Sequence, residues 1–151
     1  MLKGINNISL DAKGRFAVPT RYREELMESC GGKLVVTIDR DHCLLIYPQP
    51  EWQEIERKIN KLPNFNKRAR SLQRLLVGHA TEIDMDGNGR MLLTTPLRKF
   101  AGLEKHAVLI GQGNKLELWD EERWEQKRDQ WLEENDLDGD DLPPELESLS
   151  L

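Results

Sequence analysis

The sequence predicts an α+β fold built from two copies of one β-β-α-β-β-α unit, because the chain repeats itself. Residues 8–23 match residues 83–98 at an offset of 75, and residues 36–38 match residues 108–110 at an offset of 72. In each copy, alternating apolar residues lead into a helical pattern, and a hairpin and a second helix follow. Each copy of such a repeat is one supersecondary unit that packs against the other. The repeat therefore predicts the fold class before any single residue does.

Each copy begins with two predicted strands separated by a five-residue loop. Apolar residues alternate with polar ones in these strands, as in half-buried strands, at Ile8/Leu10 and Phe16/Val18, then Ile83/Met85 and Met91/Leu93. The loops, residues 11–15 and 86–90, start with an aspartate whose carboxylate can accept backbone N–H bonds. A glycine stands fourth, where it can adopt a positive φ. We therefore expect four residues to brace the loops: Asp11, Gly14, Asp86 and Gly89.

A helix follows the second strand of each copy. Thr95 is expected to cap the helix of the second copy, with Pro96 at its first helical position, and Thr20 occupies the matching place in the first copy. The glycines at positions 31, 32 and 102 are expected to end the two helices.

A hairpin and a second helix complete each copy. The hairpins are predicted over residues 34–38 and 44–47, and over 108–110 and 116–119. Trp52 and Trp124 occupy matching positions of the second helices, which favours packing in the core over stacking on bases. These units divide the chain into a first half (1–62), a linking helix (63–79), a second half (80–132) and an acidic tail (133–151).

Charge is distributed unevenly along the chain. The net charge is −5, but residues 129–151 contain nine acidic residues and no Lys or Arg, so residues 1–128 hold all 22 basic residues against 18 acidic ones. The body of the protein is therefore mildly basic. The linking helix contains a basic run, which we interpret as a solvated face in preference to a DNA-contacting one: Lys67, Arg68, Arg70 and Arg74.

Several function classes find no support in the sequence. The chain has no run of 18 apolar residues and no signal peptide, so we expect neither a membrane span nor export. Cys30 and Cys43 lack metal-ligand spacing and are expected to be reduced thiols of a cytoplasmic protein. No nucleophile elbow, phosphate-binding glycine loop or paired-carboxylate site is present. We therefore predict no catalytic residues, no cofactor and no small-molecule substrate.

The second loop resembles a calcium site, and two observations count against that interpretation. Asp84, Asp86, Asn88 and Gly89 fit the first places of an EF-hand loop. Place twelve, however, is Thr95 instead of the bidentate Glu, and the first copy has a lysine at place five, which cannot ligate a cation. We predict no metal.

The arginine that ends each loop has two interpretations. Each arginine could pair with the aspartate four residues earlier and simply brace the turn. Alternatively, loops with a fixed base present Lys13, Arg15 and Arg90 outward. A guanidinium offers paired donors that match phosphate or the O6/N7 edge of guanine, and two copies suit a repeating polyanion. We predict these three as the DNA-binding residues.

Three segments closely resemble the MraZ family, which is built from two fused halves of the kind found in AbrB-type regulators. They are residues 11–23 (DAKGRFAVPTRYR), 86–90 (DGNGR) and 73–80 (QRLLVGHA), and the resemblance runs from about Met1 to about Trp131. It implies a swapped-hairpin β-barrel with flanking helices. One departure is Thr94, where the first copy has Pro19.

The resemblance also implies a function. Members are expected to be homo-oligomeric rings in the cytoplasm, associated with the nucleoid, that place the loops against double-stranded DNA. They are expected to bind tandem short repeats in the promoter of their own division and cell-wall gene cluster and to repress it. The alternative is a protein-interaction module of the antitoxin type without operator-specific DNA binding. A small hydrolase is a third hypothesis, without any catalytic constellation to support it.

Overall fold

The computed structural model describes residues 1–134, 143–147 and 149, which fall into two compact units, Met1–Glu121 and Glu122–Leu151. The first unit holds the strands of both repeats and both candidate loops. The second holds nearly all of α5 (Glu121–Glu134) and the short α6 (Pro144–Glu147). Residues 135–142, 148 and 150–151 of the predicted acidic tail lie outside the described residues. None of the described helices is long and apolar enough to cross a membrane.

Both repeats follow the predicted order of elements. The first comprises β1 (Leu2–Ser9), β2 (Arg15–Ala17), α1 (Thr20–Cys30), β3 (Leu34–Ile38), β4 (Leu44–Pro48) and α2 (Gln49–Asn60). The second comprises β5 (Thr81–Glu82), β6 (Arg90–Leu92), α4 (Thr95–Ala101), β7 (His106–Gly113), β8 (Leu116–Asp120) and α5. Between them lie α3 (Lys67–Leu72) and a π-helical turn, η1 (Gln73–Val77).

The strands of the two repeats are interleaved in one antiparallel sheet of order β1-β7-β8-β4-β3-β5. The first strand of each repeat pairs with the third strand of the other, β1 with β7 and β5 with β3, while β4 and β8 meet at the centre. A separate two-stranded ribbon joins β2 to β6. This arrangement confirms the predicted α+β fold of two AbrB-like repeats. The predicted boundaries at residues 62, 79 and 132 stay a prediction, because the repeats share one sheet.

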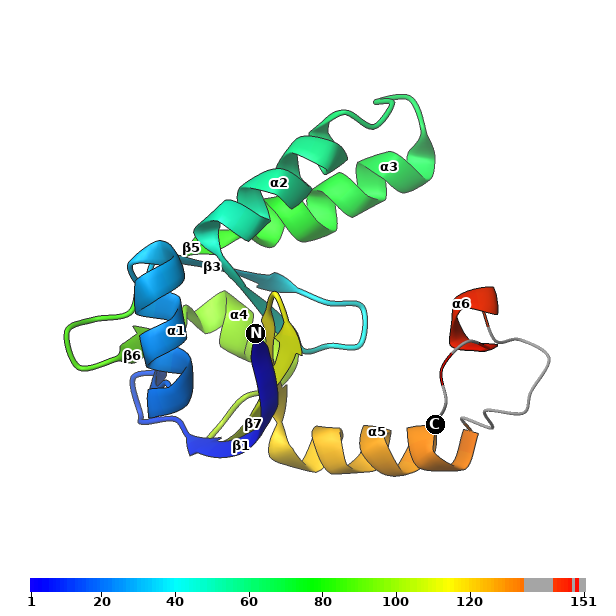
Figure 1. Cartoon of the computed structure of the whole chain (residues 1–151). Coiled ribbons are helices and arrows are strands. Elements are labelled where there is room, and N and C mark those ends of the chain that lie inside the picture. The colour runs from blue at the N-terminus through cyan, green and yellow to red at the C-terminus, as the bar shows by residue number, and fades with distance from the viewer. Residues whose placement is uncertain (135–142, 148, 150–151) are drawn as a thin grey trace. The chain divides into compact units, whose positions relative to one another are not determined.

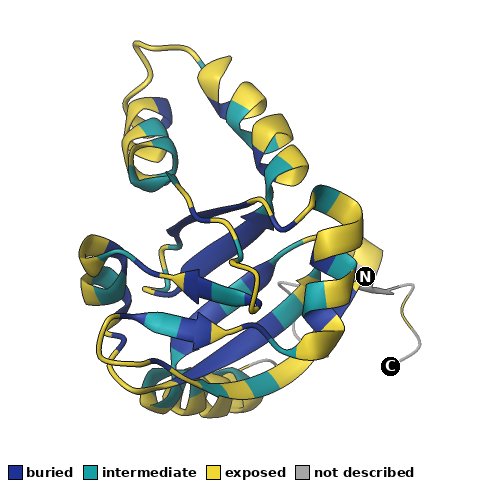
Figure 2. Cartoon of the chain, turned by 90° about the vertical axis from the view of Figure 1, so that its left-hand side faces the viewer, coloured by how far each residue is buried: buried dark blue, intermediate teal, exposed yellow. Residues whose placement is uncertain are grey.

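The apolar positions of the period-2 pattern line the core. Figure 2 shows the sheet strands largely buried, while the helices expose one side. Four of the buried side chains come from the two segments that follow the loops: Phe16, Val18, Met91 and Leu93. The predicted strand over Ile83 and Met85 ends earlier than expected, at Glu82. Their amides still donate to carbonyls of residues 34 and 32, so the segment continues along the first repeat beyond the end of the strand.

The C-terminal ends of α1 and α4 agree with the prediction, whereas their N-terminal ends differ from it. Gly31 and Gly102 end α1 and α4 in the left-handed conformation, at φ 63° and 64°. The predicted threonine caps are wrong, because Pro19 and Thr94 are the cap residues and neither caps through its side chain. The chain is extended at these two residues and helical from Thr20 and Thr95 onward, so each helix begins one residue earlier than a threonine cap requires.

The linking segment forms a helical hairpin with α2, which Figure 1 shows side by side with α3. The hydroxyl of Thr37, the one buried polar side chain among the described residues, donates to the Leu76 carbonyl at 2.6 Å and ties β3 to η1. The four basic residues predicted to form a solvated face are exposed, while Ala69 between them is buried. Trp52 is buried as expected, whereas Trp124 is only half-buried and contacts Trp131 edge to face at 5.9 Å.

Candidate nucleic-acid interface

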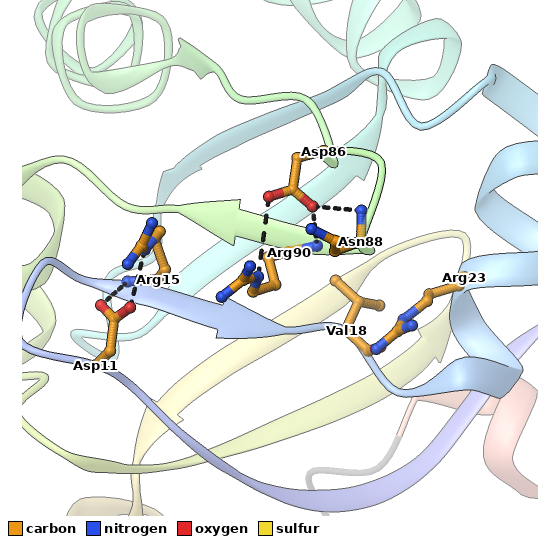
Figure 3. Close-up of polar contacts among 7 residues, drawn as sticks. All are labelled: Asp11, Arg15, Val18, Arg23, Asp86, Asn88 and Arg90. Atoms are coloured by element: carbon orange, nitrogen blue, oxygen red, sulfur yellow. Dashed lines mark hydrogen bonds and ion pairs between the residues drawn. The ribbon is translucent and has the colours of Figure 1, made fainter.

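Loop 1 (residues 11–15) is closed by the carboxylate of its first residue. One oxygen of Asp11 accepts the backbone N–H groups of Lys13 and Arg15, both at 2.9 Å. The other oxygen accepts the Arg15 Nε–H at 2.8 Å (Figure 3). Backbone bonds between residues 11 and 15, and from Gly14 to Asp11, complete the turn. Gly14 adopts φ +90°, a conformation that side chains rarely tolerate.

Loop 2 (residues 86–90) has the same backbone and a looser side-chain contact. Asp86 accepts the N–H groups of Asn88 and Arg90 at 2.9 Å, as its counterpart does in loop 1. The Arg90 Nε lies 4.0 Å from the Asp86 carboxylate, at the limit of an ion pair. Gly89 adopts φ +73°. The four predicted bracing residues thus hold two equivalent turns.

The electrostatics of the two aspartates follow from these contacts. The backbone N–H of Arg15, helped by its guanidinium and by the N–H of Lys13, lowers the pKa of Asp11 to about 2. The backbone N–H of Arg90, then that of Asn88 and the nearby arginine charges, lower the pKa of Asp86 as well. Both carboxylates are therefore ionised at neutral pH and act as acceptors throughout the physiological range.

The ribbon β2–β6 places both arginines on one face. Arg15 lies opposite Leu92, and Ala17 lies opposite Arg90. Because successive side chains of a strand point to opposite sides, these four residues share the outer face, and the alternate residues of both strands are buried in the core. Diagonal neighbours on such a face have Cβ atoms about 7 Å apart. The ribbon therefore carries two guanidiniums within reach of one ligand.

In loop 1 the structure shows the bracing contact of the arginine, while its binding of DNA stays a prediction. Arg15 braces the turn through Nε, and no described residue accepts a hydrogen bond from its terminal nitrogens. Its side chain is 38% exposed and that of Arg90 is 42% exposed, so each can be both anchored and presented. Lys13 is exposed at the tip of loop 1, where Asn88 stands in loop 2. The structure thus brings Arg15 and Arg90 together and leaves Lys13 beside them.

The carboxylate of Asp86, which the calcium interpretation would use as a ligand, is engaged within its own turn. It already accepts two backbone N–H groups of loop 2. The part of the chain that the structure describes contains no group of three or more His, Cys, Asp or Glu residues placed to hold a metal ion. Loop 2 is a hydrogen-bonded turn between strands, as loop 1 is.

The two loops are locked to each other across the repeats. The Gly14 carbonyl accepts the N–H of Leu93 at 3.0 Å, and the Gly89 carbonyl accepts the N–H of Val18 at 2.9 Å. Each loop is therefore fastened to the segment that follows the other loop. The sequence analysis assigned no role to Arg23 and Arg98, which lie over these glycines. The signal was available, because the two arginines occupy matching positions of the repeats.

Two interleaved repeats that present twin Asp-x-x-x-Arg loops on one ribbon define a duplicated AbrB-like protein. A family model described as "MraZ protein, putative antitoxin-like" matches residues 1–75 and 76–141. The transcriptional regulator MraZ of Methylococcus capsulatus is 59% identical over 99% of both chains. Those of Halorhodospira halophila and Thioalkalivibrio sulfidiphilus are 57% and 56% identical over the full length. The chain therefore belongs to the MraZ family of transcriptional regulators, which is not a class of enzymes.

Proposed function

We propose that this regulator binds double-stranded DNA in a sequence-specific manner through the ribbon β2–β6 and its loops. The observation that carries the proposal is the outer face of the ribbon, on which Arg15 and Arg90 stand on braced turns. A two-stranded ribbon fits the major groove of B-DNA, and an arginine there can donate to both O6 and N7 of guanine. Lys13, at the exposed tip of loop 1, is placed to contact phosphate.

The target we propose is a set of tandem short repeats in the promoter of the gene cluster for division and cell-wall synthesis that contains its own gene. Binding represses that cluster. One chain offers only two loops on a weakly charged body, so several chains bound to successive repeats convert later contacts into intramolecular ones. A homo-oligomeric ring satisfies this requirement, because closed symmetry presents identical loops at regular intervals. The protein then works in the cytoplasm, associated with the nucleoid.

The test is a fluorescence-anisotropy titration with the promoter region upstream of the gene and with a scrambled duplex of equal length. We expect tighter binding to the promoter, with affinity falling steeply as salt is raised. Arg15→Ala should remove the preference for the promoter. Arg68→Ala, which removes one positive charge from an exposed position of α3, is the matched control and should keep it.

The same titration separates this proposal from the antitoxin-type alternative. An interaction module without operator specificity would bind the two duplexes equally at every salt concentration. Equal binding by the unmodified chain would therefore overturn the proposal, as would a preference for the promoter that survives the loss of both loop arginines.

A further inference from the structure

The side chain of Arg98, on α4 of the second repeat, lies directly over loop 1 of the first. A Cβ atom added to Gly14 would lie 2.5 Å from the Arg98 Nε and 2.8 Å from its Cδ and Cζ. Arg23, on α1 of the first repeat, lies in the same way over Gly89 in loop 2. Both glycines are buried although their loops are on the surface. The same contact thus occurs twice, each time between different repeats.

Hydrogen bonds hold the two arginines in these places. The Arg23 Nε donates to the Val18 carbonyl at 2.5 Å, and Figure 3 shows these two residues. The amide of Val18 donates to the carbonyl of Gly89. A terminal nitrogen of Arg98 donates to the Thr95 hydroxyl at 3.1 Å. The Arg98 Nε is buried without an acceptor among the described residues. A buried donor without a partner is unfavourable, so hydrogen bonding alone does not explain this arginine.

We propose that Arg23 and Arg98 are positioning residues that act across the repeats. Arg98 fixes loop 1 and so orients Arg15, while Arg23 fixes loop 2 and so orients Arg90. A glycine at positive φ has more accessible backbone conformations than any other residue. A guanidinium that lies across the glycine excludes the backbone conformations in which the loop would occupy the same space. Each arginine that faces DNA is thereby ordered before binding, and less conformational entropy is lost in the complex.

The expected effect on DNA binding rests on the proposed function, but the ordering of the loops by Arg23 and Arg98 does not. Hydrogen–deuterium exchange of the free protein measures loop order directly. Arg98→Ala should speed exchange of residues 11–15 and leave residues 86–90 unchanged, and Arg23→Ala should do the reverse. Lys99→Ala, which removes a charge from the exposed neighbouring position on α4, should change neither loop. A variant that loosens the loop of its own repeat, or both loops equally, would overturn the proposal.

A double-mutant cycle on promoter DNA tests the second part. Arg98→Ala should weaken binding by about 2- to 12-fold per loop, the cost of ordering one side chain on binding. It should add little once Arg15 is alanine but keep its full effect once Arg90 is alanine, because Arg90 stands on the other loop. The salt slope of binding should not change. A slope reduced by about one would show a direct phosphate contact and contradict a positioning role.

Arg98→Lys guards against a variant that fails to fold. Lysine keeps the charge and the stem as far as Cδ, but it lacks the guanidinium whose Nε and Cζ also lie over Gly14. We expect this variant to melt as the unmodified protein does and to show faster exchange in loop 1 only. Exchange in loop 1 at the unmodified rate would overturn the proposal. If the unmodified chain does not bind the promoter, the proposed function fails, while the exchange pattern still decides the role of the two arginines.

Discussion

Loop 1 and loop 2 have the same backbone conformation, but the aspartate carboxylate holds the arginine more closely in loop 1. In both, an aspartate accepts the same two backbone N–H groups at 2.9 Å. In loop 1, Arg15 also bonds this carboxylate at 2.8 Å, whereas in loop 2 the Arg90 Nε stands 4.0 Å away. The backbone turn therefore forms whether or not the arginine is in close contact with the aspartate. The ion pair is a separate feature, so the two loops need not contribute equally to binding.

The largest expected effect is the loss of the loop arginines. Arg15→Ala should abolish promoter-specific binding, because each base contact contributes about 1–3 kcal/mol of discrimination and, in the proposed oligomer, the loss is repeated in every subunit. Arg90→Ala should act in the same direction but less strongly, since its side chain is less firmly held. Anisotropy titrations of both variants test the order. An unchanged preference for the promoter in Arg15→Ala, at an unchanged melting temperature, would sink the claim.

Gly14→Ala should have the next largest effect, because the alanine both strains the backbone and displaces Arg98. A positive φ costs a residue with a β-carbon about 1–2 kcal/mol, and the added atom would overlap the guanidinium. Thermal unfolding and promoter titration should both show the loss. Gly87→Ala is the control, since Gly87 has open space around it and the matching position of loop 1 is already Ala12. Equal losses in the two variants would show that the overlap with Arg98 is unimportant.

Asp11→Asn should loosen loop 1 more than Asp86→Asn loosens loop 2. The amide loses the charge that holds the Arg15 guanidinium, and the second loop has only a long contact to lose. Hydrogen exchange of the amides of Lys13 and Asn88 measures the two losses. A larger effect in loop 2 would reverse the comparison.

Lowering the pH should also affect the two loops differently, but this difference should be smaller than those above. The pKa of Asp11 falls from 3.8 to about 2 in the folded protein, so its contribution to stability is fully present above pH 3.8. That contribution is lost as the pH falls toward 2. The pKa of Asp86 is also lowered, without the close guanidinium. Carboxyl titrations followed by NMR should place Asp11 below Asp86, and the opposite order would refute the stronger bracing of loop 1.

The smallest expected effect is that of removing the acidic tail, which should change DNA binding without favouring either loop. Truncation after Leu132 removes eight carboxylates and no basic residue, so repulsion of phosphate falls. We expect tighter binding to random DNA at low salt and unchanged promoter preference. Light scattering of the same variant checks the assembly. A smaller oligomer would show that the tail is a structural element.

Much of the fold could be predicted because the sequence contains two copies of the same pattern of residues. The repeat located the strands, the loops and the glycine-ended helices at residues 31 and 102. Both helices begin one residue earlier in the structure than predicted, since Thr20 and Thr95 are their first helical residues and not their caps. A capping signal read from residue type does not say where the extended backbone ends.

The site was predicted in part, for a physical reason. The aspartate, glycine and arginine of each loop are neighbours in sequence, so their spacing predicts their contacts. The positions of Arg23 and Arg98 depend on the interleaving of the strands, which brings each helix over the loop of the other repeat. The unequal ion pairs were not predictable either, because both loops have the same Asp-x-x-x-Arg spacing.

The most direct measurement asks whether Arg15 touches a guanine. Replacing single guanines of the bound promoter repeats by 7-deazaguanine removes the N7 acceptor while keeping the base pair. We expect at least one replacement to weaken binding of the unmodified protein and to have no further effect on Arg15→Ala. Replacements that weaken both proteins by the same factor, or neither, would contradict base recognition by the braced arginine of loop 1.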